Sequence, residues 1–225
     1  MIDMNISGIK EKPEIKKYGG EILNNGPDGP SIEQIKEESI RESIPSVSAS
    51  TGKFLEMLAV LSGAKNIVEV GCANGYATGY LIRAALKNGG RVTAFEKDAP
   101  RRQMAENNLS FHIKRGTVTL IEADALKAVE LIPLDIDFLF IDAMKRQYRA
   151  ILETFMPYLR KGAIVFSDDI YFQGVLEPQK TLSRHKTIVK GLTEYLAYLN
   201  ELEIRGAVKN YFYEYEDGMA VTVIL

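Results

Sequence analysis

Residues 67–76 read Ile-Val-Glu-Val-Gly-Cys-Ala-Asn-Gly-Tyr, and this run is the strongest indication of the fold class. Its β-branched first half predicts a buried strand, its second half predicts a glycine turn, and residues 77–87 continue as a helix. Gly71 can adopt a positive φ angle, and Gly75 lets a ligand approach the backbone at the helix N-terminus. The run therefore predicts a nucleotide-binding cradle in an open α/β sheet. A nicotinamide oxidoreductase is disfavoured, because the dinucleotide fingerprint needs a glycine where Ala73 stands.

The next two predicted strands also end in acidic residues. Residues 91–95 precede Glu96, and residues 117–121 precede the sequence Glu-Ala-Asp that ends at Asp124. An acid at the tip of the second strand is placed to accept hydrogen bonds from both hydroxyls of a ribose. Each acid alone could be a structural cap. Around one glycine turn, however, they predict an adenosine pocket.

Two later apolar runs end in three more aspartates. Residues 139–141 precede Asp142, and residues 163–166 precede Ser167, Asp168 and Asp169. Both runs are typical of buried parallel strands, whose carboxyl ends meet at one sheet edge where open α/β folds bind ligands. Helix caps and loop acids are the alternative interpretation. Three converging carboxylates suit a hard divalent cation such as Mg²⁺, so we expect a metal site there.

The order of these motifs resembles that of the metal-dependent class I S-adenosylmethionine O-methyltransferases. This family includes catechol and caffeoyl-CoA O-methyltransferases and a bacterial enzyme that methylates hydroxyuridine at the tRNA wobble position. The resemblance runs from about Pro45 to the C-terminus. The matching segments, in chain order, are EVGxxxGY at 69–76, FEKD at 95–98, EADA at 122–125, FIDAMKxxY at 140–148, SDDxxxxG at 167–174 and EDGMAV at 216–221.

The resemblance implies a Rossmann-like fold with a seven-stranded, mostly parallel sheet and helices on both faces. A C-terminal antiparallel hairpin is also predicted by the strand, turn and strand pattern of residues 207–215 and 219–225. The implied methyl donor is S-adenosylmethionine, and the residues expected to bind it are Val47, Glu69, Gly71, Gly75, Tyr76, Glu96, Asp124 and Asp142. The implied metal ligands for Mg²⁺, or for Mn²⁺ or Ca²⁺, are Asp142, Asp168 and Asp169. Relatives also suggest a homodimer.

Lys145 is the expected catalytic residue together with Asp142. It lies one helical turn beyond Asp142. Methyl transfer requires an oxyanion held near the methyl carbon, and Lys145 is placed to take the acceptor's proton if burial and the cation lower its pKa. The alternative interpretation is that Lys145 is an exposed lysine in the first turn of a helix, without a catalytic role. Its position and the resemblance favour catalysis.

Three positions depart from the family pattern. Asp169 stands where many relatives have asparagine as the last metal ligand, which adds a negative charge. Ala77 stands where catechol enzymes usually offer a serine hydroxyl to the methionine carboxylate, and Thr78 is expected to face elsewhere on the helix. Met144 replaces a tryptophan that flanks the substrate ring, so a flat catechol slot is less expected.

The acceptor has to be inferred from the segment after the aspartates. Tyr171 and Phe172 could stack on an arene or a nucleobase, and Arg184 belongs to a basic cluster that could meet RNA phosphates. This segment most resembles the bacterial tRNA enzyme, so 5-hydroxyuridine in tRNA is the first expectation. A small catechol-like or caffeoyl-CoA-like phenol is the alternative. A non-catalytic nucleic-acid-binding protein on the same scaffold is disfavoured by the intact set Asp142, Lys145, Asp168 and Asp169.

Composition agrees with a single catalytic domain. The chain has 225 residues, of which 46% are hydrophobic, enough for a substantial core. A net charge of −2 argues against extensive nucleic-acid coating without excluding a local basic patch. One cysteine excludes an internal disulfide. No apolar run reaches the roughly 18 residues of a membrane span, so no membrane partner is expected. The first residues lack a signal pattern, which predicts a cytoplasmic protein.

The chain divides into an N-terminal arm with a lid helix, residues 1–44, and a methyltransferase domain, residues 45–225. Ser31 is expected to cap the lid helix, with Ile32, Ile35 and Ile40 as its buried stripe. Ser48 or Ser50 starts the next helix, whose buried stripe is expected to comprise Phe54, Leu55, Leu58 and Leu61. Further helices are predicted at 76–87, 99–111, 125–131, 148–159 and 187–202.

Overall fold

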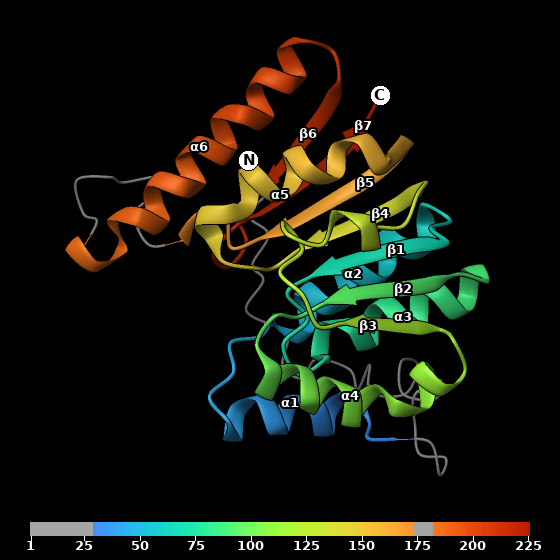
Figure 1. Ribbon diagram of the computed structural model, residues 1–225. Helices are drawn as coiled ribbons and strands as arrows, with labels where there is room; N and C mark the ends of the chain where they lie inside the picture. The colour runs from blue at the N-terminus through green and yellow to red at the C-terminus, as the bar shows by residue number, and fades with distance from the viewer. Residues whose placement is uncertain (1–28, 173–181) are drawn as a thin grey trace, which may run out of the picture.

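The structure is a computed structural model that describes residues 29–172 and 182–225. Most of the predicted N-terminal arm, residues 1–28, and the side chain of Arg184 lie outside the described part. One seven-stranded sheet runs through the molecule in the order β3-β2-β1-β4-β5-β7-β6 (Figure 1). Its strands are β1 (Asn66–Val70), β2 (Arg91–Phe95), β3 (Val118–Ile121), β4 (Ile136–Ile141), β5 (Leu159–Asp168), β6 (Val208–Tyr213) and β7 (Met219–Ile224).

Strands β1 to β5 are parallel, and β7 is antiparallel to both of its neighbours. The predicted C-terminal hairpin is therefore confirmed, with β7 lying between β5 and the edge strand β6. The order reverses between β1 and β4, since the chain builds β2 and β3 on one side before it returns to add β4 and β5 on the other. Such a switch point opens a crevice at the carboxyl ends of the strands.

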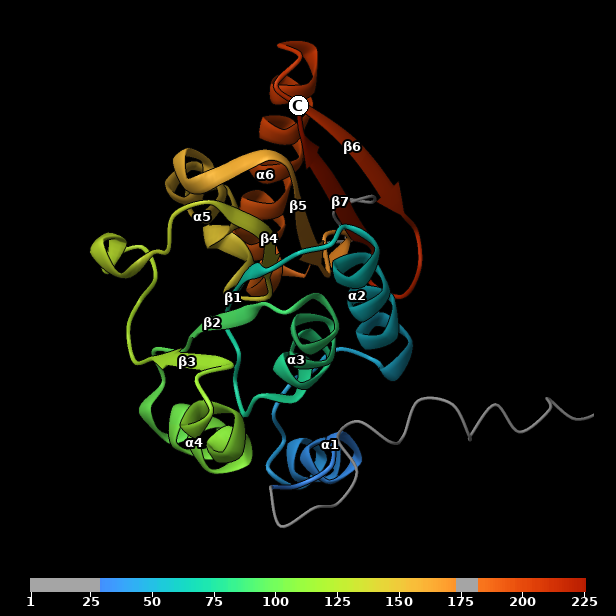
Figure 2. The same cartoon turned by 90° about the vertical axis from the view of Figure 1, so that its right-hand side faces the viewer.

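Helices cover both faces of the sheet (Figures 1 and 2). Helices α1 (Ile32–Arg41), α2 (Ala49–Leu61), α3 (Tyr76–Asn88) and α4 (Ala99–Lys114) bury side chains in one hydrophobic cluster with β1, β2 and β4. Helices α5 (Tyr148–Phe155) and α6 (Lys186–Ile204) pack in a second cluster on the other face. None of the helices in the described ranges is long and apolar enough to cross a membrane.

Helix α1 begins where the sequence predicted. The Ser31 hydroxyl accepts a hydrogen bond from the Gln34 amide at 3.3 Å, and the Gln34 side chain accepts one from the Ser31 amide at 2.8 Å. This capping box satisfies two amide groups that the helix itself leaves free. The helix then packs in the same core as α2 and α3 through Ile32 and Ile35. The division of the chain at residue 45 stays a prediction.

Two residues of the predicted buried stripes were placed wrongly. Ile40 is 69% exposed, and its neighbour Ser39 is buried instead, where its hydroxyl donates to Asn74 Oδ1 at 3.0 Å. Leu61 is 76% exposed because it is the last residue of α2 and extends beyond the covered face. The spacing of hydrophobic residues predicted both helices correctly. The hydrogen bond between Ser39 and Asn74 determines which face of α1 is buried.

Two predicted helices differ from those observed. Residues 125–131 form only a 3₁₀ turn, Val129–Leu131, because Asp124 accepts hydrogen bonds from the amides of Leu126 and Lys127 and starts a local turn. Helix α5 ends at Phe155 and continues as the 3₁₀ turn Met156–Tyr158. Pro157 has no amide hydrogen for the α-helical bond and clashes with the preceding turn.

Candidate active site

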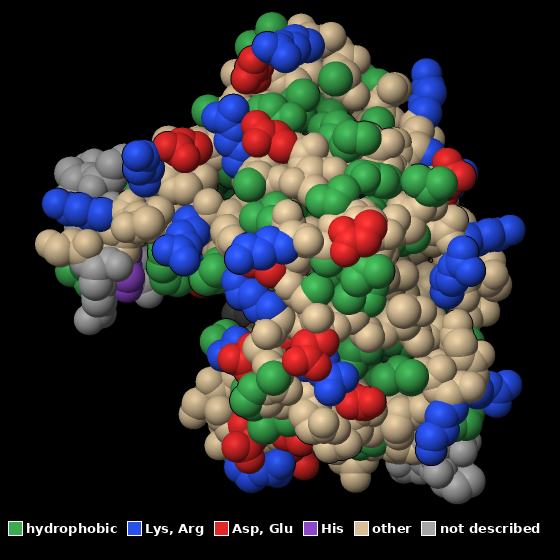
Figure 3. All heavy atoms as spheres, in the orientation of Figure 1, with side chains coloured by type: hydrophobic (Ala, Val, Ile, Leu, Met, Phe, Trp, Pro, Cys, Tyr) green, Lys and Arg blue, Asp and Glu red, His purple; other side chains and the backbone are tan. Residues whose placement is uncertain are grey.

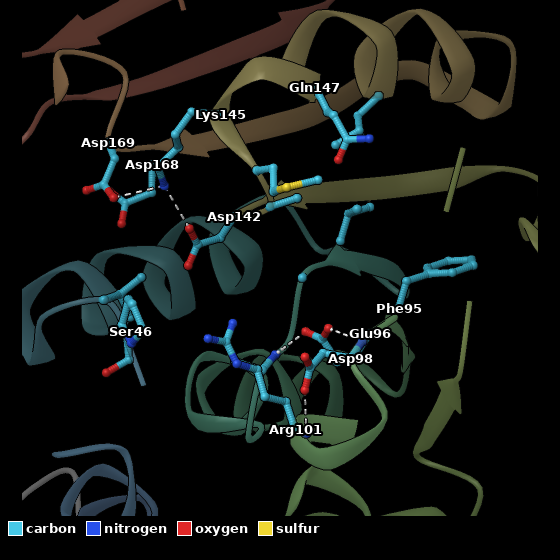
Figure 4. A pocket seen from close by; sticks show the side chains of 18 of the residues that line it. Ser46, Phe95, Glu96, Asp98, Arg101, Asp142, Lys145, Gln147, Asp168 and Asp169 are labelled. Atoms are coloured by element: carbon cyan, nitrogen blue, oxygen red, sulfur yellow. Dashed lines mark hydrogen bonds and ion pairs between the residues drawn. The ribbon is translucent and has the colours of Figure 1, made fainter. Parts of the chain in front are cut away.

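The three aspartates predicted to bind a metal come together at the carboxyl edge of the sheet. Strand β4 pairs with β5 so that Ile141 faces Ser167, which sets Asp142 beside Asp168. Asp169 follows in the left-handed region, with φ of 55°. One carboxylate oxygen from each aspartate lies within 4.8 Å of the other two (Figure 4). The register of two strands therefore builds the cluster.

Burial raises the pKa of Asp168 to about 8, and repulsion from Asp142 and Asp169 adds to the effect. Three carboxylates this close together repel one another when they are ionised, so a nearby positive charge is needed to stabilise them. Hard oxygen donors in this number suit a divalent cation such as Mg²⁺, with further positions left for water or substrate oxygens. The donor set thus fits the cation that the resemblance implies.

Lys145 supplies positive charge to this cluster. Its Nζ lies 3.1 Å from Asp142 Oδ1 and 2.8 Å from Asp169 Oδ2. Burial lowers the pKa of Lys145, but interactions with Tyr148, Asp142 and Asp169 outweigh it and raise the pKa well above its ordinary value. The lysine is therefore protonated in this arrangement, and the lowered pKa that its expected role as proton acceptor required is not found. The alternative interpretation as an exposed lysine is wrong, since only 15% of the side chain is exposed.

Tyr148 connects Lys145 to the strand that carries Asp168. Its hydroxyl accepts a hydrogen bond from Lys145 Nζ at 3.0 Å and donates one to the backbone carbonyl of Asp168 at 3.0 Å. In the sequence, Tyr148 is the last residue of the segment FIDAMKxxY and the start of a predicted helix. Its spacing of three residues from Lys145, across the start of a helix, was the signal that could have indicated this contact.

A cavity of about 900 Å³ extends from the aspartate cluster along the ends of β1, β2 and β3. Of the residues predicted to bind donor, metal or acceptor, those that line it are Val47, Gly71, Glu96, Asp124, Asp142, Lys145, Asp168, Asp169 and Phe172. Four others, Glu69, Gly75, Tyr76 and Tyr171, are not among its lining residues. Ser46 and Glu216 also line the cavity, and lining residues without a sequence signal include Lys36, Arg101 and Gln147.

Glu96 fixes the end of the cavity opposite the aspartate cluster. One carboxylate oxygen accepts a hydrogen bond from the Ala73 amide at 2.9 Å, and the other accepts one from the Asp98 amide at 2.8 Å. The side chain is thereby held between the glycine turn and the start of α4 (Figure 4). Asp124 lies nearby in an ion pair with Lys97 at 3.6 Å.

The two glycines of the turn have different structural roles. Gly71 has φ of 94°, and a Cβ there would overlap the backbone carbonyl of Asp142, so glycine brings β1 and β4 together at the cavity. Gly75 has φ of 88° at the start of α3, and a Cβ there would lie 2.9 Å from the Leu109 side chain of α4. The left-handed backbone conformation and the packing of α3 against α4 therefore explain Gly75.

Glu69 lies under the turn, away from the cavity surface. It is fully buried, and one of its oxygens accepts a hydrogen bond from the Thr78 hydroxyl at 2.6 Å. Burial raises the pKa of Glu69 to about 8. Thr78 thus faces away from the cavity, as the sequence predicted. Tyr76 is also buried, and its hydroxyl lies 3.1 Å from that of Tyr80.

An open seven-stranded sheet with a reversed last strand, a glycine turn after β1 and an acid after β2 defines a class I methyltransferase fold. Similarities to known proteins support this class. The family model described as O-methyltransferase matches residues 24–221, and the chain therefore belongs to the S-adenosylmethionine-dependent O-methyltransferases. The chain is 31% identical over 195 residues to a catechol O-methyltransferase of Niastella koreensis, covering 80% of this chain and 82% of the relative.

Other similarities extend along most of the chain. A caffeoyl-CoA O-methyltransferase of Populus kitakamiensis is 29% identical over 181 residues, covering 75% of each chain. Among solved structures, a Bacillus cereus O-methyltransferase in complex with SAH has a TM-score of 0.76 at 23% identity, with coverage of 91% of this chain and 93% of that chain. TomG of Streptomyces achromogenes, in complex with SAM, has a TM-score of 0.74 at 22% identity, with coverage of 90% and 92%. These structural likenesses support the fold.

Proposed function

We propose that this enzyme methylates one hydroxyl of a small phenol with two vicinal oxygens, with a divalent cation bound by Asp142, Asp168 and Asp169. The observation that carries the proposal is the convergence of three carboxylates and Lys145 at one end of a cavity whose other end is formed by Glu96. The relatives named as catechol and caffeoyl-CoA O-methyltransferases support this acceptor class.

In the reaction, a phenolic oxygen attacks the methyl carbon of the sulfonium in line. The carbon–oxygen bond forms as the carbon–sulfur bond breaks, and its electron pair stays on sulfur, so S-adenosylhomocysteine leaves. Bound at the three aspartates, the cation would supply Lewis acidity that favours the phenolate. The phenol's proton leaves to solvent as the phenolate forms, and the Lys145 ammonium directs its own proton toward that oxygen. Tyr148 keeps this ammonium in place, which limits misorientation at the reacting atoms.

Glu96 is the residue that we propose to bind the ribose of the donor. Its two oxygens are already oriented by the amides of Ala73 and Asp98, so accepting ribose hydroxyls would cost little rearrangement. Gly71 and Val47 then border the middle of the donor, and Asp124 lies toward the adenine end. Glu69, Gly75 and Tyr76 do not line the cavity. That these three residues contact the donor stays a prediction.

A second candidate acceptor is 5-hydroxyuridine in tRNA. Four exposed basic side chains favour this acceptor. Arg146 lies just before α5, Arg149 lies on α5, and Lys186 and Lys190 lie on α6. Figure 3 shows several lysine and arginine side chains around the protruding end of α6. Against it, Arg149 pairs with Glu153 and Lys190 with Glu194, and Glu216 and Asp217 add negative charge to the cavity lining. The tRNA partner and the homodimer stay predictions.

Transfer of labelled methyl from S-adenosylmethionine tests the proposal. The acceptors are a catechol panel, caffeoyl-CoA and hydroxyuridine-containing tRNA, each with Mg²⁺ and with EDTA. Label in small phenols that EDTA abolishes is the expected result. Label in tRNA alone would replace the phenol by the second candidate, and label that persists in EDTA would remove the metal from the proposal.

A further inference from the structure

Lys36 lines the cavity from α1 and has no role in the proposal above. Its Nζ donates hydrogen bonds to the Ser46 hydroxyl at 2.8 Å and to the Val47 carbonyl at 3.0 Å. The ammonium also lies 4.8 Å from the centre of the Tyr76 ring. All of these partners are uncharged. Within the described ranges, no carboxylate oxygen lies within ion-pair distance of Lys36, and Glu216 acts on it only from farther away.

A partly buried ammonium with neutral partners attracts an anion. Removing a charge from water costs free energy unless an opposite charge compensates it. Burial accordingly lowers the pKa of Lys36. The cavity therefore presents an uncompensated positive charge on the wall formed by α1 and residues 45–48.

S-adenosylmethionine carries one carboxylate, on its amino-acid arm. Its ribose is expected at Glu96, and its methyl group must face the aspartate cluster. The amino-acid arm then has the remaining wall of the cavity available, which runs from the turn at Gly71 to the segment that contains Ser46. On the turn side, neither Ala77 nor Thr78 lines the cavity, and the hydroxyl of Thr78 is bonded to Glu69.

We infer that Lys36 binds the carboxylate of the donor's methionine moiety. The inference rests on S-adenosylmethionine being the donor and on its ribose lying at Glu96. By the same contacts, Lys36 holds Ser46 and Val47 against the cavity, so one side chain couples the closing segment to the amino-acid arm. Lys36 thereby selects for donors that carry a carboxylate.

Calorimetric binding to three ligands separates this role from a purely structural one. S-adenosylhomocysteine has the whole amino-acid arm, S-adenosyl-3-thiopropylamine lacks only the carboxylate, and 5′-methylthioadenosine lacks the arm. A charge-assisted hydrogen bond predicts that Lys36→Met weakens S-adenosylhomocysteine binding by about tenfold to a hundredfold. The other two ligands should change less than about twofold. Lys36→Arg should restore most of the loss, and Lys53→Met, at an exposed position of α2, is the matched control.

Equal losses for all three ligands would overturn the inference, because they would show that Lys36 only holds the Ser46 segment. Unchanged binding of S-adenosylhomocysteine to Lys36→Met would overturn it as well. Both results leave the proposed donor intact, since the wild-type enzyme binds it. Failure of the wild-type enzyme to bind S-adenosylhomocysteine would instead overturn the donor assignment together with the inference.

Discussion

Replacing Glu69 with glutamine should make the stability of the enzyme less dependent on pH. Glu69 is fully buried on β1, and burial raises its pKa from 4.5 to about 8. A carboxyl whose pKa is higher in the folded state contributes fully to stability below pH 4.5, and this contribution is lost as the pH rises toward 8. Glutamine stays neutral and can still accept the Thr78 hydrogen bond.

The magnitude follows from the two pKa values. Each pH unit between them corresponds to about 1.4 kcal/mol of unfolding free energy. At pH 7, Glu69 stays protonated in the folded state but is ionised in the unfolded chain, and taking up this proton on folding costs on the order of 3 kcal/mol. The second oxygen of Glu69 has no hydrogen-bond partner, so the amide that replaces it adds a constant cost of about 1–3 kcal/mol at every pH. The slope with pH, rather than the absolute stability, is the diagnostic quantity.

Urea unfolding of both proteins at pH 5, 6, 7 and 8, in EDTA and without S-adenosylmethionine, measures this slope. We expect the free energy of the wild type, relative to Glu69→Gln, to fall by about 1.4 kcal/mol per pH unit over this range. The raised pKa of Asp168 contributes equally to both proteins and cancels. Parallel pH profiles would refute the reasoning, because they would mean that Glu69 titrates alike in the folded and unfolded chains.

Three further substitutions test the cavity. Asp142→Ala should abolish turnover with Mg²⁺ while S-adenosylhomocysteine binds nearly as before, because Glu96 holds the far end; undiminished turnover would show that the metal is not needed. Glu96→Ala should weaken S-adenosylhomocysteine binding by about tenfold or more in calorimetry, as charged hydrogen bonds are lost; an unchanged Kd would mean that another acid binds the ribose. Tyr148→Phe should lower kcat by about tenfold with unchanged donor affinity, because Lys145 loses a partner that orients it. Tyr158→Phe, outside the cavity, is its control, and equal effects of the two changes would contradict a positioning role.

Most of the fold could be predicted because its signals are local. Apolar runs placed all seven strands, and capping residues such as Ser31 and Ser48 placed the starts of α1 and α2. The predicted helix at residues 125–131 failed for a local reason too, since the Asp124 side chain competes for the backbone amides that a helix needs.

The site was predictable where strand ends carry it. Asp142 and Glu96 follow buried parallel strands and Asp168 is the last residue of one, and the geometry of a sheet brings such positions to one edge. The places of Lys36 and Tyr148 in the site could not be predicted in this way. Lys36 meets Ser46 only because α1 docks on the glycine turn, where Asn74 accepts a hydrogen bond from Ser39 and donates one to the Ile35 carbonyl. No periodicity in the sequence indicates that contact.

The sequence by itself determined the class of fold, the methyltransferase family and the acids at the strand ends, because these depend on residue type, order and spacing. The tertiary structure decided which side chains reach the cavity. It buried Glu69 beneath the turn, gave Gly75 a packing role and brought Lys36 into the cavity wall. The physical reason is that burial and long-range contacts depend on how helices rotate and dock, and this is set by packing among segments that are distant in the chain.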